Sequence, residues 1–196
     1  IAGAEHTGVH AGKVDLFANH KVILTPLPSS ADWAVQKLIQ LWSVAKAEVI
    51  CMDVSKHDEV LAHTSHLPHL MAFNLVEQLA NREDNLDIFR YAAGGFRDFS
   101  RIAASDPQMW HDIFFANKNA ILNAVAGFEQ QLSVLKQLIE NEDSQALMGL
   151  LGHAQAARQH FNHMLAKKPL MEKNKVTQQF TILPGKKTFT GKFTVP

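Results

Sequence analysis

The sequence predicts a mainly α-helical protein in which a helical domain follows the last βαβ piece of an α/β domain. Two observations lead to this fold class. Two short β-branched segments enclose a helical segment near the start, and beyond residue 54 apolar residues recur at helical spacing. With 46% hydrophobic and 19% charged residues, the 196-residue chain can bury a core.

The first part of the chain has the pattern of a βαβ unit. Residues 21–25 and 48–52 are β-branched runs bounded by turn residues, which is typical of buried strands. Between them, Ser29 and Asp32 form a capping box that predicts the start of a helix. A strand, a helix and a strand in this order belong to a parallel sheet. Because two strands alone do not make a stable sheet, we expect the remaining strands to precede Ile1.

Helices are predicted from Ser55 onward. Ser55 and Asp58 form a second capping box, and Pro68 predicts a kink or a break in the apolar helix that follows. The glycine pair at 94–95 marks a turn. The run at 105–107, Ser-Asp-Pro, predicts a helix start with proline at the first helical position.

The most regular pattern predicts a long helix with an apolar seam. The seam residues step by 4, 3, 4, 3 and 4 positions, which is heptad spacing: Ile121, Val125, Phe128, Leu132, Leu135 and Ile139. Such a seam needs a partner helix. The partner is either the next predicted helix, at 144–166, or the same helix of a second subunit. Packing within one chain is somewhat favoured for a single seam, and both alternatives stay open.

The ends and the charge balance restrict the class of protein. The chain starts at Ile1 without a methionine and ends at Pro196 in a strand-like pattern, so we expect a fragment of a longer protein. The 19 basic and 19 acidic residues balance, which indicates neither nucleic-acid nor membrane-surface binding. No apolar run approaches the roughly 20 residues of a membrane span. No signal segment opens the chain, so we expect a cytoplasmic protein.

Several kinds of site are disfavoured. The single cysteine, Cys51, excludes a disulfide scaffold, and its place in a predicted buried strand indicates an inert thiol. Three of the eleven histidines, His63, His66 and His69, are each three positions apart. On a helix this spacing turns the first and third rings away from each other, so no metal site is predicted. No G-x-G-x-x-G run occurs, so any nicotinamide cofactor has its phosphates bound outside this chain.

Polar residues that break the apolar pattern are the candidates for binding. Ser65, His66 and His69 interrupt an apolar helix around the proline. Arg97 and Arg101 stand four positions apart on one helix face after the glycine pair, and a planar guanidinium suits a carboxylate ligand. Taken alone, a surface arginine pair that bridges to neighbouring aspartates is the favoured interpretation.

Five blocks of this sequence resemble, in the same order, prephenate and arogenate (cyclohexadienyl) dehydrogenases, and the resemblance covers residues 1–166. The blocks are Ile-Ala-Gly-Ala-Glu at 1–5, Lys-Val-Ile-Leu-Thr-Pro at 21–26, Ser-His-Leu-Pro-His at 65–69, Ala-Gly-Gly-Phe-Arg-Asp-Phe-Ser-Arg-Ile-Ala-Ala-Ser-Asp-Pro at 93–107 and Met-Trp-His-Asp-Ile-Phe at 109–114. The resemblance implies that residues 1–54 are the C-terminal remnant of an NAD-binding domain. It implies that residues 55–170 are a helical dimerisation and substrate domain.

The activity implied by the resemblance is an oxidative decarboxylation that depends on NAD (or NADP) and converts prephenate to 4-hydroxyphenylpyruvate in tyrosine biosynthesis. The resemblance also implies a homodimer. The family places a His-Pro pair, with the catalytic histidine, immediately before the Ile-Ala-Gly run. That histidine would precede Ile1, so no catalytic residue is assigned within this chain. Ala4 stands where the family commonly has Ser or Thr.

The resemblance also implies six substrate-site residues. Ser65 and His69 line the substrate pocket near the nicotinamide, and Arg101 pairs with a substrate carboxylate. The other three shape the pocket: Gly94 lets the backbone approach, Trp110 closes the pocket from the partner subunit, and Glu5 pairs with an arginine and gates the entrance.

The last part of the chain follows a different pattern. Residues 171–196 are rich in lysine and form a basic linker. Residues 180–184 and 188–196 resemble the start of EPSP synthase (3-phosphoshikimate 1-carboxyvinyltransferase), which implies a fusion to a second enzyme. An alternative for the whole chain is a helical dimerisation or binding module without chemistry of its own. Once the residues that precede Ile1 are restored, adding prephenate and NAD⁺ distinguishes these two possibilities, because NADH forms only if the chain is part of the enzyme.

Overall fold

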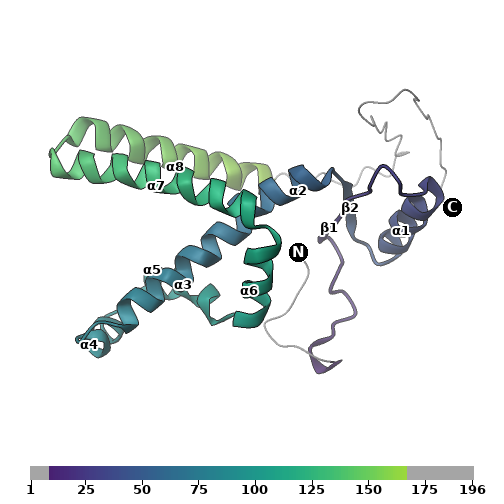
Figure 1. Ribbon diagram of the computed structural model, residues 1–196, viewed down its shortest axis with the longest axis horizontal. Coiled ribbons are helices and arrows are strands. Elements are labelled where there is room, and N and C mark those ends of the chain that lie inside the picture. Colours follow the sequence, from purple (N-terminus) through teal and green to yellow (C-terminus); the bar gives the residue numbers. More distant parts are fainter. Residues whose placement is uncertain (1–8, 167–196) are drawn as a thin grey trace. The chain divides into compact units, whose positions relative to one another are not determined.

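Figure 1 shows the computed structural model of the chain, which describes residues 9–166. This part is mainly α-helical with one two-stranded sheet near its start, and the predicted fold class is confirmed. The chain divides into two compact units, Ile1–Val134 and Leu135–Pro196, which are described separately. The predictions for Glu5 and for residues 171–196 lie outside the described residues.

The predicted βαβ unit is present. β1 (Lys21–Leu24) and β2 (Glu48–Cys51) pair in parallel, and α1 (Asp32–Val44) connects them. A short 3₁₀ turn, η1 (Val9–Ala11), precedes β1. This unit is therefore one crossover of a parallel sheet, as the β-branched runs predicted.

Two details of the βαβ unit differ from the prediction. The strands are only half-buried and Cys51 is exposed, because the sheet has no further strand beside these two in the described part of the chain. The capping box predicted from Ser29 and Asp32 is wrong, since α1 begins at Asp32 without a side-chain cap. The hydroxyl of Ser30 instead accepts a hydrogen bond from the Leu27 N–H, at 3.0 Å, within the preceding loop.

Three helical segments follow one another without a loop. They are α2 (Val54–Leu61), η2 (Ala62–His66) and α3 (Leu67–Ala80), and Figure 1 shows them as one continuous path. The middle segment is a π turn, in which the Leu67 N–H donates to the Ala62 carbonyl, five residues back instead of four.

Pro68 explains the π turn. Proline has no N–H to donate, and in a regular α-helix its ring would clash with the carbonyl four residues before it. A wider turn moves that carbonyl aside and keeps the helical path intact. The interruption predicted at Pro68 therefore takes the form of one π turn directly before it.

Shorter helical segments follow α3 within the first unit. They are α4 (Asn85–Arg90), α5 (Gly94–Ser100), η3 (Arg101–Ala104) and α6 (Pro107–Ala116). Both α5 and η3 pack against α3. The glycine pair that predicted a turn instead opens α5, and the connection lies in residues 91–93.

Two aspartates cap helices of this unit. Asp53 caps α2, and its carboxylate accepts a hydrogen bond from the backbone N–H three residues later, at 2.8 Å. The capping box predicted at Ser55 is therefore wrong, because the cap lies two positions earlier. Asp106 caps α6 by accepting from the Met109 N–H at 2.7 Å. The start predicted for α6, with Pro107 as its first residue, is confirmed.

The two long helices are α7 (Lys118–Glu140) and α8 (Ser144–Ala166), as predicted. A core cluster forms where the beginning of α7 meets the π turn, from Ala62, Ile121 and Ala124. Other seam residues remain on the surface of the chain: Phe128, Leu132 and Ile139 are 37%, 52% and 63% exposed. Within residues 9–166, no helix is long and apolar enough to cross a membrane.

Candidate functional site

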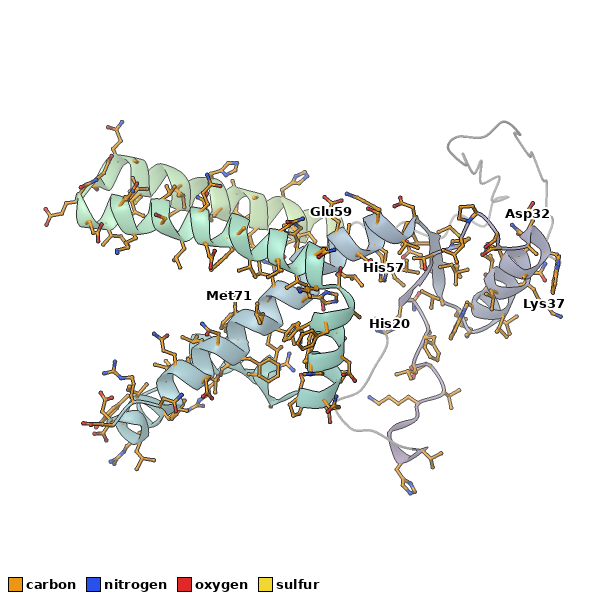
Figure 2. All side chains as sticks on the ribbon, in the orientation of Figure 1. His20, Asp32, Lys37, His57, Glu59 and Met71 are labelled. Atoms are coloured by element: carbon orange, nitrogen blue, oxygen red, sulfur yellow. The ribbon has the colours of Figure 1, made fainter. Side chains whose placement is uncertain are left out.

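Aromatic and polar side chains gather where η2 and α3 meet α6. Trp110 of α6 stacks on His69 of α3, with ring centroids 3.8 Å apart and 21° between the planes. His66 lies edge-on to the same indole, with a centroid distance of 6.2 Å. Side chains fill the space between α3 and α6 in Figure 2. The π turn thus brings two of the three histidines of this segment to one tryptophan.

The proton position on His69 follows from its hydrogen bond. Its Nδ1 lies 2.8 Å from the backbone carbonyl of Ser65. A carbonyl oxygen only accepts, so Nδ1 carries the proton and donates it. In the neutral ring, Nε2 is then the acceptor. Ser65 therefore orients His69 through its backbone, and the predicted pair is brought together by one turn of helix.

His66 is the most deeply placed histidine of the site, with 8% of the residue exposed. Burial is the first cause that lowers its pKa below the ordinary value of histidine, and the neighbouring His57 and His69 lower it further. Asp58 acts in the opposite direction. Figure 2 labels His57 on α2, where its Nδ1 lies 2.9 Å from the Asp58 carboxylate. Burial of His66 therefore favours its neutral form.

Asn117, at the end of α6, contacts His66 directly. Its Nδ2 lies 3.2 Å from His66 Nδ1 and 2.8 Å from the backbone carbonyl of Asp58. The sequence pattern indicates His66 as a polar residue that interrupts the apolar spacing, but it does not indicate Asn117. No spacing rule connects residues so far apart along the chain, and the only local signal was a polar residue between two helices.

Trp110 also has a buried donor. The residue is 6% exposed, and its Nε1 has no hydrogen-bond partner among the described residues. A buried N–H without an acceptor costs about 1–3 kcal/mol. The contacts of Trp110 described here come from its own chain, so its predicted contribution to a pocket of the partner subunit stays a prediction.

Arg101 and Gly94 lie on the elements that cover another part of α3. Arg101 opens η3 and is exposed, and Arg97 lies one turn earlier on α5. Gly94 is the first residue of α5, and a Cβ built on it would meet nothing within 4 Å. No contact within the described chain therefore requires glycine at this position.

The residues present do not fit the phosphates of a dinucleotide. The chain has no G-x-G-x-x-G run, and its part of the α/β domain is one βαβ unit without a glycine-rich loop between β1 and α1. Across residues 9–166, no group of three or more His, Cys, Asp or Glu side chains is placed to hold a metal ion.

These features define the class of protein. It joins the end of a parallel α/β domain to a helical domain in which two histidines on an interrupted helix meet a tryptophan of α6, and an arginine lies on η3, which packs against the same helix. Two family models match the chain in this order. Residues 1–51 match the nucleotide-binding domain of prephenate dehydrogenase, and residues 53–153 match its dimerization domain. The chain belongs to the prephenate dehydrogenase family.

Individual relatives agree with the family models. The chain is 37% identical to cyclohexadienyl dehydrogenase of Zymomonas mobilis over 160 aligned residues. These residues make up 81% of this chain and 55% of that protein. It is 38% identical over 148 residues to prephenate dehydrogenase of Bacillus subtilis, over 75% of this chain and 40% of that protein. The chain thus spans about half the length of these relatives or less.

Solved structures of the family have the same fold. Prephenate dehydrogenase from Aquifex aeolicus, in complex with hydroxyphenyl propionate and NAD⁺, superposes with a TM-score of 0.77 at 39% identity, over 82% of this chain and 57% of that one. Synechocystis arogenate dehydrogenase superposes with a TM-score of 0.72 at 25% identity, over 82% of this chain and 59% of that one.

Proposed function

We propose that this chain is the helical part, with the end of the nucleotide-binding domain, of an NAD-dependent prephenate or arogenate dehydrogenase. The observation that carries the proposal is the stacked pair of His69 and Trp110 beside the π turn, with a buried donor on the tryptophan that has no acceptor among the described residues. Relatives named for this activity match across the same region.

The proposed reaction is an oxidative decarboxylation. With prephenate, hydride leaves the ring carbon that bears the 4-hydroxyl, the ring carboxylate departs as CO₂, and aromatic 4-hydroxyphenylpyruvate remains. NAD⁺ supplies the hydride acceptor when it is bound. Because this chain has no phosphate-binding glycine loop, we propose that residues outside it hold the cofactor. The histidine that would contact the 4-hydroxyl is likewise expected outside this chain.

The residues of this chain bind and orient the substrate in the proposal. A substrate with two carboxylates needs paired positive charge, because an unpaired buried charge costs several kcal/mol. Arg101 supplies the guanidinium, while Ser65 and His69 line the pocket. The remaining members shape and close it: Gly94 by leaving space for the substrate, Trp110 by covering it, and Glu5, outside the described residues, at the entrance.

The domain limits and the assembly are part of the same proposal. Residues 1–54 end the NAD-binding domain, residues 55–170 form the dimerisation and substrate domain, and residues 171–196 link to a second enzyme that resembles EPSP synthase. The exposed residues of α7, together with the match to a dimerization domain, support a homodimer. We place the protein in the cytoplasm.

A joined enzyme tests the proposal. The nucleotide-binding part of the Zymomonas mobilis relative is fused before Ile1, and NADH absorbance is followed with prephenate or with arogenate as substrate. We expect NADH to form with at least one of them, and the 196-residue chain alone to form none and to bind NAD⁺ weakly. A folded, dimeric joined enzyme that is inactive with both substrates would instead support the non-catalytic module.

A further inference from the structure

We propose that Asn117 is a positioning residue, which holds His66 as the neutral tautomer with its proton on Nε2. Its use in catalysis rests on the proposed function, but its effect on His66 does not. The proposal comes from one amide group that touches two acceptors on different elements.

The orientation of the Asn117 amide is fixed by the Asp58 carbonyl. This oxygen lies 2.8 Å from Nδ2 and only accepts hydrogen bonds, so the nearer amide atom is the NH₂ group. The same NH₂ group lies 3.2 Å from His66 Nδ1. An NH₂ group only donates, and therefore Nδ1 accepts and carries no proton. In the neutral ring the proton is then on Nε2.

The backbone around Asn117 holds the amide in place. The Asn117 N–H donates to the Ile113 carbonyl at 3.0 Å, which ends α6, and its own carbonyl accepts from the Ile121 N–H at 3.1 Å, which begins α7. Ile121 is 5% exposed and packs in the cluster that contains Ala62, the first residue of the π turn. The donor and the ring that it fixes are therefore anchored to the same core.

The surroundings of His66 favour the neutral ring as well. The titratable groups that act on it are His57 and Asp58 from α2 and His69 from α3. From the other side it meets Trp110 of α6 and Asn117, which carry no charge. Asn117 thus selects which nitrogen of an already neutral ring holds the proton.

The consequence is a pair of histidines with opposite tautomers. His69 donates from Nδ1 to the Ser65 carbonyl, which leaves Nε2 as an acceptor. His66 accepts at Nδ1 and keeps Nε2–H as a donor. A substrate that bears a hydroxyl and carboxylates needs both kinds of partner, and within the proposed function the two rings supply one acceptor and one donor.

The experiment is NMR of the full 196-residue chain with ¹⁵N-labelled histidine rings. Long-range ¹H–¹⁵N spectra distinguish protonated from unprotonated ring nitrogens, and His66→Gln assigns the signals. In the wild type we expect an unprotonated Nδ1 and a protonated Nε2 on His66. A protonated Nδ1 on neutral His66 would overturn the proposal, whether or not any variant folds.

A charged variant gives the second readout. Asn117→Asp replaces the donor by an acceptor of the same shape, so we expect the pKa of His66 to rise by about one to three units. Asn119→Asp, the same change at an exposed position of α7, should leave His66 unaffected. Equal titrations of His66 in both variants would refute the role of Asn117. These NMR results combined with an inactive joined enzyme would refute only the proposed function.

Discussion

The imidazole of His69 and the indole of Trp110 lie nearly parallel, at 3.8 Å between ring centroids, while the indole N–H beside them is buried without an acceptor in the described part of the chain. Stacking holds α6 against α3, and the free donor lowers stability unless something binds it. A site that is packed but incomplete in its hydrogen bonds is suited to a ligand with an acceptor oxygen.

Removing this donor should weaken substrate use. Trp110→Phe keeps an aromatic ring over His69 but loses the N–H. In the joined enzyme we expect kcat/KM to fall. The lost transition-state stabilisation should be about 1.5–3 kcal/mol, which is the contribution of a hydrogen bond to a charged acceptor. Trp33→Phe, at a tryptophan that is 72% exposed on α1, is the control and should change nothing. Unchanged kinetics in Trp110→Phe would show that the donor serves no substrate.

Arg101 should act on substrate rather than on folding. Arg101→Ala in the joined enzyme is expected to raise KM for the substrate far more than for NAD⁺. The transition-state free energy derived from kcat/KM should rise by about 2–5 kcal/mol, the cost of removing one partner of a charged pair that the bound substrate buries. Arg101→Lys should recover only part, because an ammonium lacks the planar fork. Arg90→Ala, at an exposed position in the last turn of α4, is the control and should leave both KM values unchanged. A lower Tm with an unchanged substrate KM would remove Arg101 from the site.

The stability of the chain should fall in mild acid because of His66. Its folded pKa is lowered, mainly by burial, so the unfolded chain binds the proton first as pH decreases. The free energy of unfolding should therefore decrease as pH falls through the ordinary histidine value of about 6.5, and this loss should level off below the folded pKa. His66→Gln should remove this component. Urea titrations between pH 8 and pH 5 measure the free energy of unfolding of the wild type and of His66→Gln. If this free energy changed with pH to the same extent in both proteins, the expectation would be contradicted.

The exposed residues of α7 should mediate self-association. We expect sedimentation at micromolar concentration to give twice the mass of the 21.8 kDa chain. Leu132→Glu places a charge among the exposed apolar residues of α7 and should shift the protein toward monomer, whereas Ser133→Glu beside it should not. A stable single-chain species in the wild type would exclude the homodimer.

The sequence predicted the kind and order of the elements because apolar spacing is a local property. The two long helices, the βαβ unit and the start of α6 at Pro107 all follow from residues within a few turns of each other. Two helix starts were wrong. At α2, Asp53 and Ser55 are both good capping residues, and the choice between them depends on which backbone N–H groups the fold leaves free.

The candidate site was predictable only in part. Ser65, His69 and Trp110 were found through short motifs, and the structure brings them together. The contact between Asn117 and His66 spans 51 positions and connects an ordinary asparagine to a histidine that had no assigned role. Such a pair depends on how α6 and α7 return to the π turn, which is tertiary information that no local pattern contains.

The π turn before Pro68 also sets the rotational phase of the helix after it. A π turn contains one residue more than an α turn, so α3 is rotated by about 100° relative to an uninterrupted helix. Apolar residues are spread around α3, and their distribution alone does not decide which side faces α6. Deleting one residue from 62–66 would leave the composition almost unchanged but would direct His69 away from Trp110. The location of the site therefore depends on the length of a single turn.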